Sequence, residues 1–186
     1  MYNINLYEKY IFLEKYSLNL NSQFASLNKV NIIYYPHLYG PEFNELEKIF
    51  FFCKKKKYKL FIIDNFKLSV QIKAHGLYLS ANNKNPINLK FYKKNFEVIG
   101  SAHNQKEYFF KKKQNCSKIF LSPIFYNKKY SINKILKISR FNLISKNWKE
   151  IVLALGGINK KNLNNLGMLK YRGFAFYSFL ETIKNP

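Results

Sequence analysis

Residues 59–79 read KLFIIDNFKLSVQIKAHGLYL, and this stretch decides the fold. Lys59 to Asp64 is an apolar run that ends in a carboxylate, as is typical of a strand buried on both faces. Phe66 to Ala74 is a helical segment, and Gly76 to Leu79 is a second apolar run. A strand, a helix and a strand in this order predict a parallel unit with a right-handed crossover.

The same alternation extends along the chain in both directions. Apolar runs predict further strands at residues 10–13, 30–35, 96–100, 118–121, 150–155 and 173–177. Segments between them predict helices at residues 41–52, 104–113, 131–145 and 159–168, a weakly helical segment at 17–28, and the start of a last helix at 179–184. Eight strands that alternate with helices favour an α/β fold of the compact (β/α)8 TIM-barrel type, with residues 1–186 as a single domain. An open flavodoxin-like or Rossmann sheet is the alternative, although no G-x-G-x-x-G follows the first strand.

The composition excludes several classes of protein. Apolar residues make up 47% of the 186 residues, which is enough for a substantial core and excludes a disordered chain. No apolar run approaches the roughly 18 residues of a membrane helix, and residues 1–10 lack the apolar region of a secretory signal. Cys53 and Cys116 lie too far apart for a zinc motif or a disulfide framework. We therefore expect a cytoplasmic protein without a membrane partner.

The charge of the chain invites a nucleic-acid interpretation. There are 32 Lys and Arg residues against 10 Asp and Glu, which gives a net charge of +22 and an attraction for any polyanion. Only Arg140 and Arg172 are arginines, however, and specific nucleic-acid readers favour Arg. The excess of Lys, Asn, Ile, Phe and Tyr is what adenine- and thymine-rich codons produce. We expect no specific nucleic-acid partner, and a polyanion-binding module is our third hypothesis.

In a barrel, the chemistry lies at the carboxyl ends of the strands. Asp64, the only Asp of the chain, ends the third strand and either holds a magnesium ion or caps the helix that begins near Phe66. Ser101 and His103 follow the fifth strand. They suit phosphate binding and general acid–base chemistry, or else Ser101 is a helix cap and His103 an exposed residue of the first turn. His75 precedes a strand, at the amino end, and is interpreted as structural.

Two features at the last strands suit a phosphate. Gly156 and Gly157 follow the seventh strand, and Tyr177 and Ser178 end the eighth just before a helix start. Backbone N–H groups at paired glycines and at a helix N-terminus bind anions, and barrels commonly bind phosphate at these two loops. The alternative is that the glycines only permit a tight turn. The residues thus predict a barrel that binds a phosphorylated small molecule.

Four motifs in register carry a resemblance to a known family. They are IGSAHN at residues 99–104, IFLSPIF at 119–125, ALGGIN at 154–159 and GFAFYS at 173–178. Their order and spacing resemble the thiamine-phosphate synthase and thiazole tautomerase superfamily. The resemblance is clear over residues 99–179 and recognisable over 59–79. It implies the same barrel fold.

The resemblance also implies an activity. Synthases of this family are transferases that join hydroxymethylpyrimidine diphosphate to thiazole phosphate in thiamine biosynthesis, and magnesium holds the departing diphosphate. Carried over by position, the implied roles are these: Asp64 as a magnesium ligand, Ser101 against the pyrimidine, Gly156, Gly157, Tyr177, Ser178 and Asn127 around the thiazole phosphate, and Lys129 on the diphosphate. In the tautomerase branch, His103 is the implied proton shuttle.

The chain departs from the family pattern where the diphosphate binds. Residues 34–38 read YYPHL, without the cations that the family carries after strand two. Asn83 stands at the position of a second metal carboxylate, and residues 127–130 read NKKY in place of a Thr-x-Thr-Lys loop. A leaving diphosphate needs metal and fixed cations, so Lys29, Lys84, Lys128 and Lys129 become the candidates to replace them.

Two hypotheses therefore come before polyanion binding. The first is a divergent thiamine-phosphate synthase that uses Mg²⁺. The second is a thiazole-phosphate tautomerase, or a binder of thiazole phosphate without catalysis, which needs only the thiazole half of the site. Both predict phosphorylated small molecules as partners. The oligomeric state stays open.

Overall fold

A computed structural model describes residues 6–17, 19–20, 24, 30–36, 43–87, 95–128, 130–170 and 173–176. Eight parallel strands form a closed barrel in which each strand pairs with its neighbours in sequence and β8 pairs with β1. The strands are β1 (Glu8–Leu13), β2 (Val30–Tyr34), β3 (Lys59–Ile63), β4 (Gly76–Leu79), β5 (Glu97–Ala102), β6 (Lys118–Leu121), β7 (Ile151–Leu155) and β8 (Gly173–Phe176). The barrel prediction is confirmed, and the predicted strands begin and end within two residues of the observed ones wherever both ends are described.

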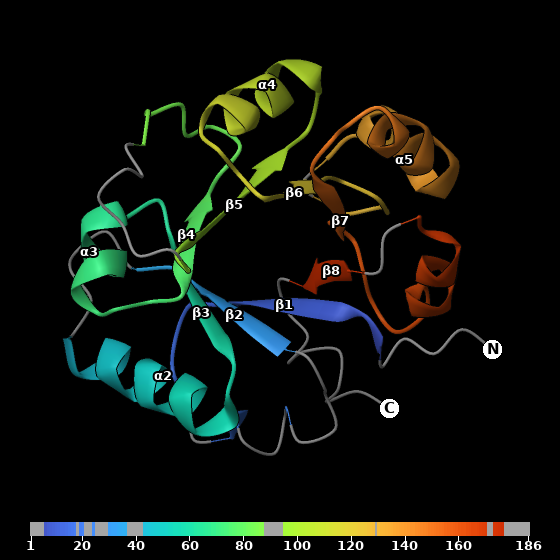
Figure 1. Ribbon diagram of the computed structural model, residues 1–186. Coiled ribbons are helices and arrows are strands. Elements are labelled where there is room, and N and C mark those ends of the chain that lie inside the picture. The colour runs from blue at the N-terminus through green and yellow to red at the C-terminus, as the bar shows by residue number, and fades with distance from the viewer. Residues whose placement is uncertain are drawn as a thin grey trace.

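Helices surround the barrel on the outside (Figure 1). They are α2 (Phe43–Lys56), α3 (Phe66–Gln71), α4 (Gln105–Lys113) and α5 (Lys137–Lys146), with the 3-10 helices η3 (Ile132–Lys134) and η4 (Leu163–Met168). Glu45 lies in the first turn of α2 and Lys54, Lys55 and Lys56 in its last turn. This charge distribution complements the helix dipole and helps to fix where α2 begins and ends.

Three predicted helices are shorter than expected, each for a local reason. The segment 66–74 ends as α3 at Gln71, because Lys73 has a φ of 54° and Ala74 N–H donates to Ser69 O. The segment 131–145 splits into η3 and α5, since Leu136 N–H donates to Pro123 O instead of continuing a helix. The prediction of a helix at 179–184 and most of the segment 17–28 lie outside the described residues.

The third shortened helix is the segment 159–168, which contains only η4. The side chain of Asn162 accepts a hydrogen bond from Asn159 N–H at 2.9 Å, and the side chain of Asn159 accepts one from Lys161 N–H at 2.9 Å. Asn side chains that bond to nearby backbone compete with the helical pattern. The start of the predicted helix is therefore a turn.

Large side chains fill the barrel interior in layers. The ring of Tyr10 meets Phe120 edge to face at 5.0 Å, and Phe12 meets Tyr78 edge to face at 5.2 Å. Such aromatic pairs are worth about 0.5 to 1.5 kcal/mol beyond their buried area. A second, larger cluster lies between the strands and the surrounding helices, and Phe141 and Leu166 are fully buried in it. The two cores make the barrel a rigid support for its strand ends.

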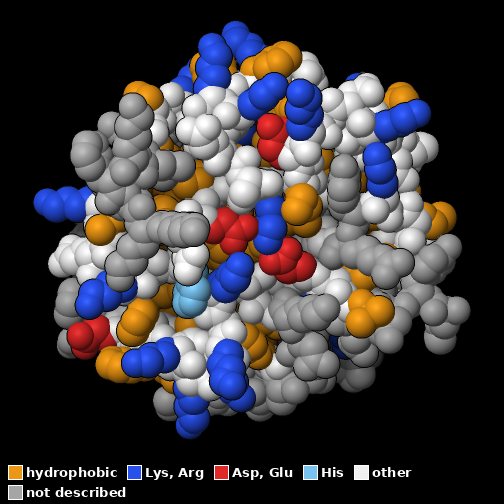
Figure 2. Space-filling model, in the orientation of Figure 1, with side chains coloured by type: hydrophobic (Ala, Val, Ile, Leu, Met, Phe, Trp, Pro, Cys, Tyr) orange, Lys and Arg blue, Asp and Glu red, His pale blue; other side chains and the backbone are white. Residues whose placement is uncertain are grey.

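A charged cluster closes the amino end of the barrel. Lys118 Nζ donates to Glu8 at 2.8 Å and to the Tyr10 hydroxyl at 3.0 Å, and it forms an ion pair with Glu97 at 3.1 Å. Lys59 pairs with Glu97 from the other side at 3.2 Å. Figure 2 shows acidic and basic side chains next to each other at the centre of the face it presents. Because the charges compensate one another, they are tolerated at the mouth of an apolar barrel.

Two further expectations concern membranes and thiols. Within the part of the chain that the structure describes, no helix is both long and apolar enough to cross a bilayer. Cys53 and Cys116 are buried free thiols. The expectation that they form no disulfide is confirmed.

Candidate active site

A cavity of about 1000 Å³ opens at the carboxyl end of the barrel. Phe12, Ile63, Tyr78, Ser101 and Leu155 come from the ends of five strands and line it from within the barrel. Ser101 is 4% exposed and belongs to β5, so the alternative that it caps a helix is wrong. The structure thus places the Ser101 hydroxyl in the apolar lining of the cavity, where a buried ligand would meet it.

The helix after β5 holds His103 in place. Asn104 caps α4, because its side chain accepts a hydrogen bond from Glu107 N–H at 3.0 Å. This cap turns Glu107 back toward the start of the helix. Glu107 Oε2 then accepts hydrogen bonds from His103 N–H at 2.7 Å and from His103 Nδ1 at 2.9 Å. His103 is therefore fixed by its neighbours rather than free in the first turn.

The other ring nitrogen of His103 meets a tyrosine from a different loop. His103 Nε2 lies 3.1 Å from the hydroxyl of Tyr130, and both side chains line the cavity. A carboxylate can only accept hydrogen bonds, so Nδ1 carries a proton, and in the neutral imidazole Nε2 then accepts from the Tyr130 hydroxyl. Burial and the charge of Glu107 raise the pKa of Tyr130, which keeps its hydroxyl protonated. Glu107, His103 and Tyr130 form a chain of hydrogen bonds that ends at the cavity.

The two glycines after β7 make room for the loop after β6. Gly156 and Gly157 have φ values of +94° and +71°, and a Cβ atom on Gly157 would lie 2.4 Å from Tyr126 O. The backbones are also joined, because Phe125 N–H donates to Gly156 O at 3.1 Å. Gly156 lines the cavity together with Asn127, whereas Gly157 lies outside its lining. The glycine pair thus brings Asn127 to the rim.

Asp64 lies beside the cavity and not in its lining. Its Oδ1 accepts hydrogen bonds from Ser80 N–H at 3.0 Å and from Asn83 Nδ2 at 2.7 Å. Asn65 caps α3 by accepting from Leu68 N–H at 3.0 Å, so the alternative role of Asp64 as the helix cap is wrong. Asp64 instead ties β3 to the loop that follows β4.

The surroundings of Asp64 do not fit a magnesium ion. Mg²⁺ requires oxygen ligands in near-octahedral geometry. Here an amide N–H of Asn83 points at the carboxylate, and an N–H donor repels a cation. Among the described residues, no three His, Cys, Asp or Glu side chains form a group that could hold a metal. The implied magnesium ligand Asp64 stays a prediction without support from its neighbours.

Two lysines bring positive charge to the cavity. Lys15 follows β1 and Lys128 follows β6, and both line the cavity. Lys84, a candidate from the sequence, lies over the ring of Phe110 at 5.5 Å and takes no part in the lining. The remaining predicted residues, Lys29, Lys129, Tyr177 and Ser178, fall outside the described part of the chain. Glu14, beside Lys15, is also in the lining, so two cations and one carboxylate face the cavity and the balance still suits an anionic ligand.

Sequence reasoning missed Glu107, Tyr130 and Lys15. The first has a local signal, since Asn104-x-x-Glu107 is the spacing of a capping box. Tyr130 has none, because its contact with His103 spans 27 positions and depends on the path of the loop after β6. Lys15 was one of many lysines in the sequence, and only the course of the chain after β1 distinguishes it.

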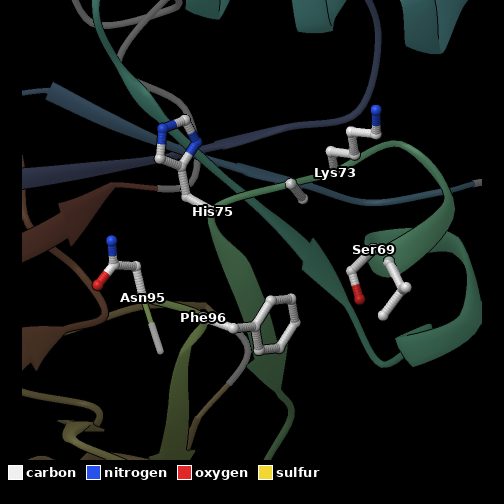
Figure 3. A pocket seen from close by; sticks show the side chains of 7 residues that line it. Ser69, Lys73, His75, Asn95 and Phe96 are labelled. Carbon is white, nitrogen blue, oxygen red and sulfur yellow. The ribbon is translucent and has the colours of Figure 1, made fainter. Parts of the chain in front are cut away.

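A smaller pocket of about 220 Å³ lies at the amino end, between α3 and the start of β5. Figure 3 shows His75 at one side of it, with Ser69 and Phe96. His75 Nδ1 accepts a hydrogen bond from Leu60 N–H at 3.2 Å, and burial together with the charge of Lys59 lowers its pKa. These contacts give His75 a structural role, as expected.

Comparisons with known proteins agree with this architecture. The chain aligns over 94% of its length with 87% of a thiamine phosphate pyrophosphorylase from Pyrococcus furiosus, with a TM-score of 0.71 and 16% identity. It covers 95% of its length and 85% of a thiamine phosphate pyrophosphorylase from Bacteroides thetaiotaomicron, with a TM-score of 0.61 and 19% identity. The YdjI aldolase from Escherichia coli K12 gives a TM-score of 0.64 at 8% identity, over 95% of this chain and 77% of that one. These likenesses show the fold.

The comparison with curated proteins gives no significant match. The sequence does match the model of a protein family, TMP-TENI, described as thiamine monophosphate synthase, over residues 41–180. This range holds the strands and loops that build most of the cavity, from β3 through Ser101 and His103 to Gly156. The chain belongs to the thiamine monophosphate synthase family.

Proposed function

We propose that this protein moves a proton on a phosphorylated thiazole, as a tautomerase-type member of its family. The observation that carries the proposal is the chain of hydrogen bonds from Glu107 through His103 to Tyr130, which ends in the cavity. A carboxylate that orients an imidazole and stabilises its protonated form is a general arrangement for acid–base catalysis. The second observation is that Asp64 is bonded to an amide where the synthase reaction needs a metal.

The proposed step conserves every atom of the substrate. His103 Nε2, directly or through the Tyr130 hydroxyl, takes a proton from one carbon of the thiazole ring system. The imidazolium that results is stabilised by Glu107, 2.9 Å from Nδ1. The same proton, or one exchanged with water, then returns to another atom of the ring, so no group leaves. Lys15 and Lys128 supply positive charge for the phosphate of the substrate.

Proton exchange with solvent tests this proposal. The protein is incubated with the thiazole phosphate in D2O, and deuterium incorporation is followed by NMR. We expect exchange by the wild type and a loss of roughly 10² to 10⁴-fold in His103→Asn, the usual effect of removing a general base. His75→Asn is the matched control, because His75 lies at the amino end and outside the cavity. Equal exchange by both variants contradicts the proposal.

Thiamine-phosphate synthase is the second candidate. The family description supports this candidate. The cavity volume of about 1000 Å³, at the upper end for ligand sites, leaves room for two substrates. This candidate predicts release of pyrophosphate from hydroxymethylpyrimidine diphosphate and thiazole phosphate in the presence of Mg²⁺. If pyrophosphate is released faster than the thiazole proton exchanges, the protein is a synthase. A third outcome, thiazole-phosphate binding without exchange or release, would identify a binding protein.

A further inference from the structure

The loop after β4 is bound to Asp64 at two points. Ser80 N–H and Asn83 Nδ2 both donate to Asp64 Oδ1, at 3.0 and 2.7 Å. Ser80, Ala81 and Asn82 line the cavity. The position of this loop relative to Asp64 therefore sets the shape of one wall of the cavity.

The orientation of the Asn83 amide is fixed by its other partner. Asn83 Oδ1 accepts a hydrogen bond from Asn85 N–H at 3.0 Å. With the oxygen engaged there, the nitrogen faces Asp64 and a flipped amide would lose both hydrogen bonds. The donor toward Asp64 is thus determined by the loop itself.

A buried lysine holds the loop from behind. Lys111 of α4 is 0% exposed, and its Nζ donates to Asn83 O at 2.6 Å and to Gln114 Oε1 at 3.0 Å. Gln114 Nε2 donates in turn to Asn83 O at 3.2 Å and to Asn85 O at 2.8 Å. The stem of Lys111 fits against Gly100, where a Cβ atom would lie 2.8 Å from Cδ. A fully buried lysine is rare, and here it binds the backbone of one short loop.

The pKa of Lys111 reflects its buried position. Burial lowers this pKa, and the negative charges of Asp64 and Glu107 offset the effect only in part. Both of its hydrogen-bond acceptors are neutral oxygens, which favour the ammonium form. Asn83 thus links the two charged groups, because its carbonyl oxygen accepts from Lys111 Nζ and its side-chain amide donates to Asp64 Oδ1.

We propose that Lys111 and Asn83 are positioning residues that replace a divalent cation at this corner of the site. The Asn83 amide binds Asp64 where a divalent cation would bind it. Lys111, which donates to the Asn83 carbonyl, supplies a fixed positive charge nearby. The loop that lines the cavity is then held without metal. The test needs no substrate, so it is independent of the proposed function.

Metal titration of the wild-type protein is the first measurement. Thermal unfolding is followed with increasing Mg²⁺ or Mn²⁺ against NaCl of the same ionic strength. We expect the same midpoint in the divalent salts and in NaCl. A saturable rise in the midpoint that Asp64→Asn removes would overturn the proposal. A site that binds metal only when folded would raise the midpoint by roughly 5 to 10 °C at a hundred times its dissociation constant.

The variant Asn83→Asp puts a second carboxylate in place of the amide that lies 2.7 Å from Asp64 Oδ1 in the wild type. We expect the midpoint of this variant to fall without metal, because of charge repulsion, and to recover with Mg²⁺. If the variant folds and shows no response to Mg²⁺, the amide does not stand at a cation position and the proposal is wrong.

The variant Lys111→Met tests the lysine, with Lys112→Met as the matched control on the exposed side of α4. Removing a buried charge can raise overall stability, so amide hydrogen exchange of residues 80–85 is the readout. We expect exchange there to accelerate at least about tenfold in Lys111→Met, the effect of losing one charged hydrogen bond. Unchanged exchange in this loop would overturn the role of Lys111.

Discussion

The hydroxyl of Tyr130 lies 3.1 Å from His103 Nε2, and the two rings are 5.7 Å apart. In the family that the sequence resembles, the loop after strand six reads Thr-x-Thr-Lys. Tyr130 occupies the position of the lysine that ends this loop. A lysine at this position would bring a cation for a phosphate group. The tyrosine brings a neutral hydroxyl that donates to the imidazole, which suits proton transfer better than diphosphate departure.

Tyr130→Phe keeps the ring and removes the hydroxyl. We expect substrate exchange to slow by about 10- to 100-fold with little change in KM, because the ring still lines the cavity while the hydrogen bond to His103 is lost. Deuterium exchange measured at several substrate concentrations gives both the maximal exchange rate and KM. Tyr126→Phe, on the same loop but 61% exposed, is the control. Identical rates for the two variants would show that the hydroxyl has no part in the reaction.

Gly157→Ala should weaken the fold through the backbone. The positive φ of +71° and a Cβ atom 2.4 Å from Tyr126 O leave no space for a methyl group without moving the loop after β6. We expect a loss of roughly 2 to 4 kcal/mol in the free energy of unfolding. Urea denaturation measures it, and an unchanged midpoint would mean that the two loops separate easily. Because Asn127 belongs to this loop, the affinity for a phosphorylated ligand should fall as well.

The charged cluster at the amino end predicts a pH dependence of stability. Burial acts to raise the pKa of Glu97, but the charges and hydrogen bonds of Lys118 and Lys59 lower it below its ordinary value of 4.5. The unfolded chain therefore takes up the proton first, and the contribution of Glu97 is present above about pH 4.5 and lost as pH falls through the folded pKa. The pKa shift of Lys118 is in the opposite direction. Burial acts to lower this pKa, but Glu8 and Glu97 raise it above 10.5. The contribution of Lys118 to stability is therefore lost only as pH rises through that higher value.

Glu97→Gln tests this dependence. We expect the variant to lose roughly 2 kcal/mol at about pH 7 and to differ less from the wild type at about pH 3. Urea denaturation at the two pH values gives the comparison. A difference that stays constant between them would show that the cluster stabilises by packing and not by charge.

The thiols of Cys53 and Cys116 should be unreactive in the folded protein. Burial raises the pKa of each to about 12, so little thiolate exists near neutral pH. We expect both to react with a thiol reagent in urea, and neither to react at a comparable rate in its absence. Rapid modification of the native protein would show that α2 or α4 opens locally.

The sequence was informative where a pattern is local. Continuous apolar runs such as residues 59–63 identify buried parallel strands, and the order of runs determines the barrel. The helix predicted at 104–113 begins at the expected place for the same reason, because Asn104 caps it. Helix lengths were harder to predict, because Leu136 and Asn159 make hydrogen bonds that compete with a helix. Glu107, one partner of His103, has the local signal of a capping box. Tyr130, its other partner, and the partners of Asp64 come from loops distant in sequence, so no local pattern reveals them.

The cluster of Glu8, Lys118 and Glu97 has a kinetic consequence for any reaction in the cavity. These charges and the aromatic layers above them close the barrel at its amino end, so the cavity opens at the carboxyl end. Molecules that enter at the carboxyl end must leave by the same opening. A product that still carries the phosphate would then occupy the place of the next substrate. The rate at which product leaves through this opening would therefore set an upper limit on turnover.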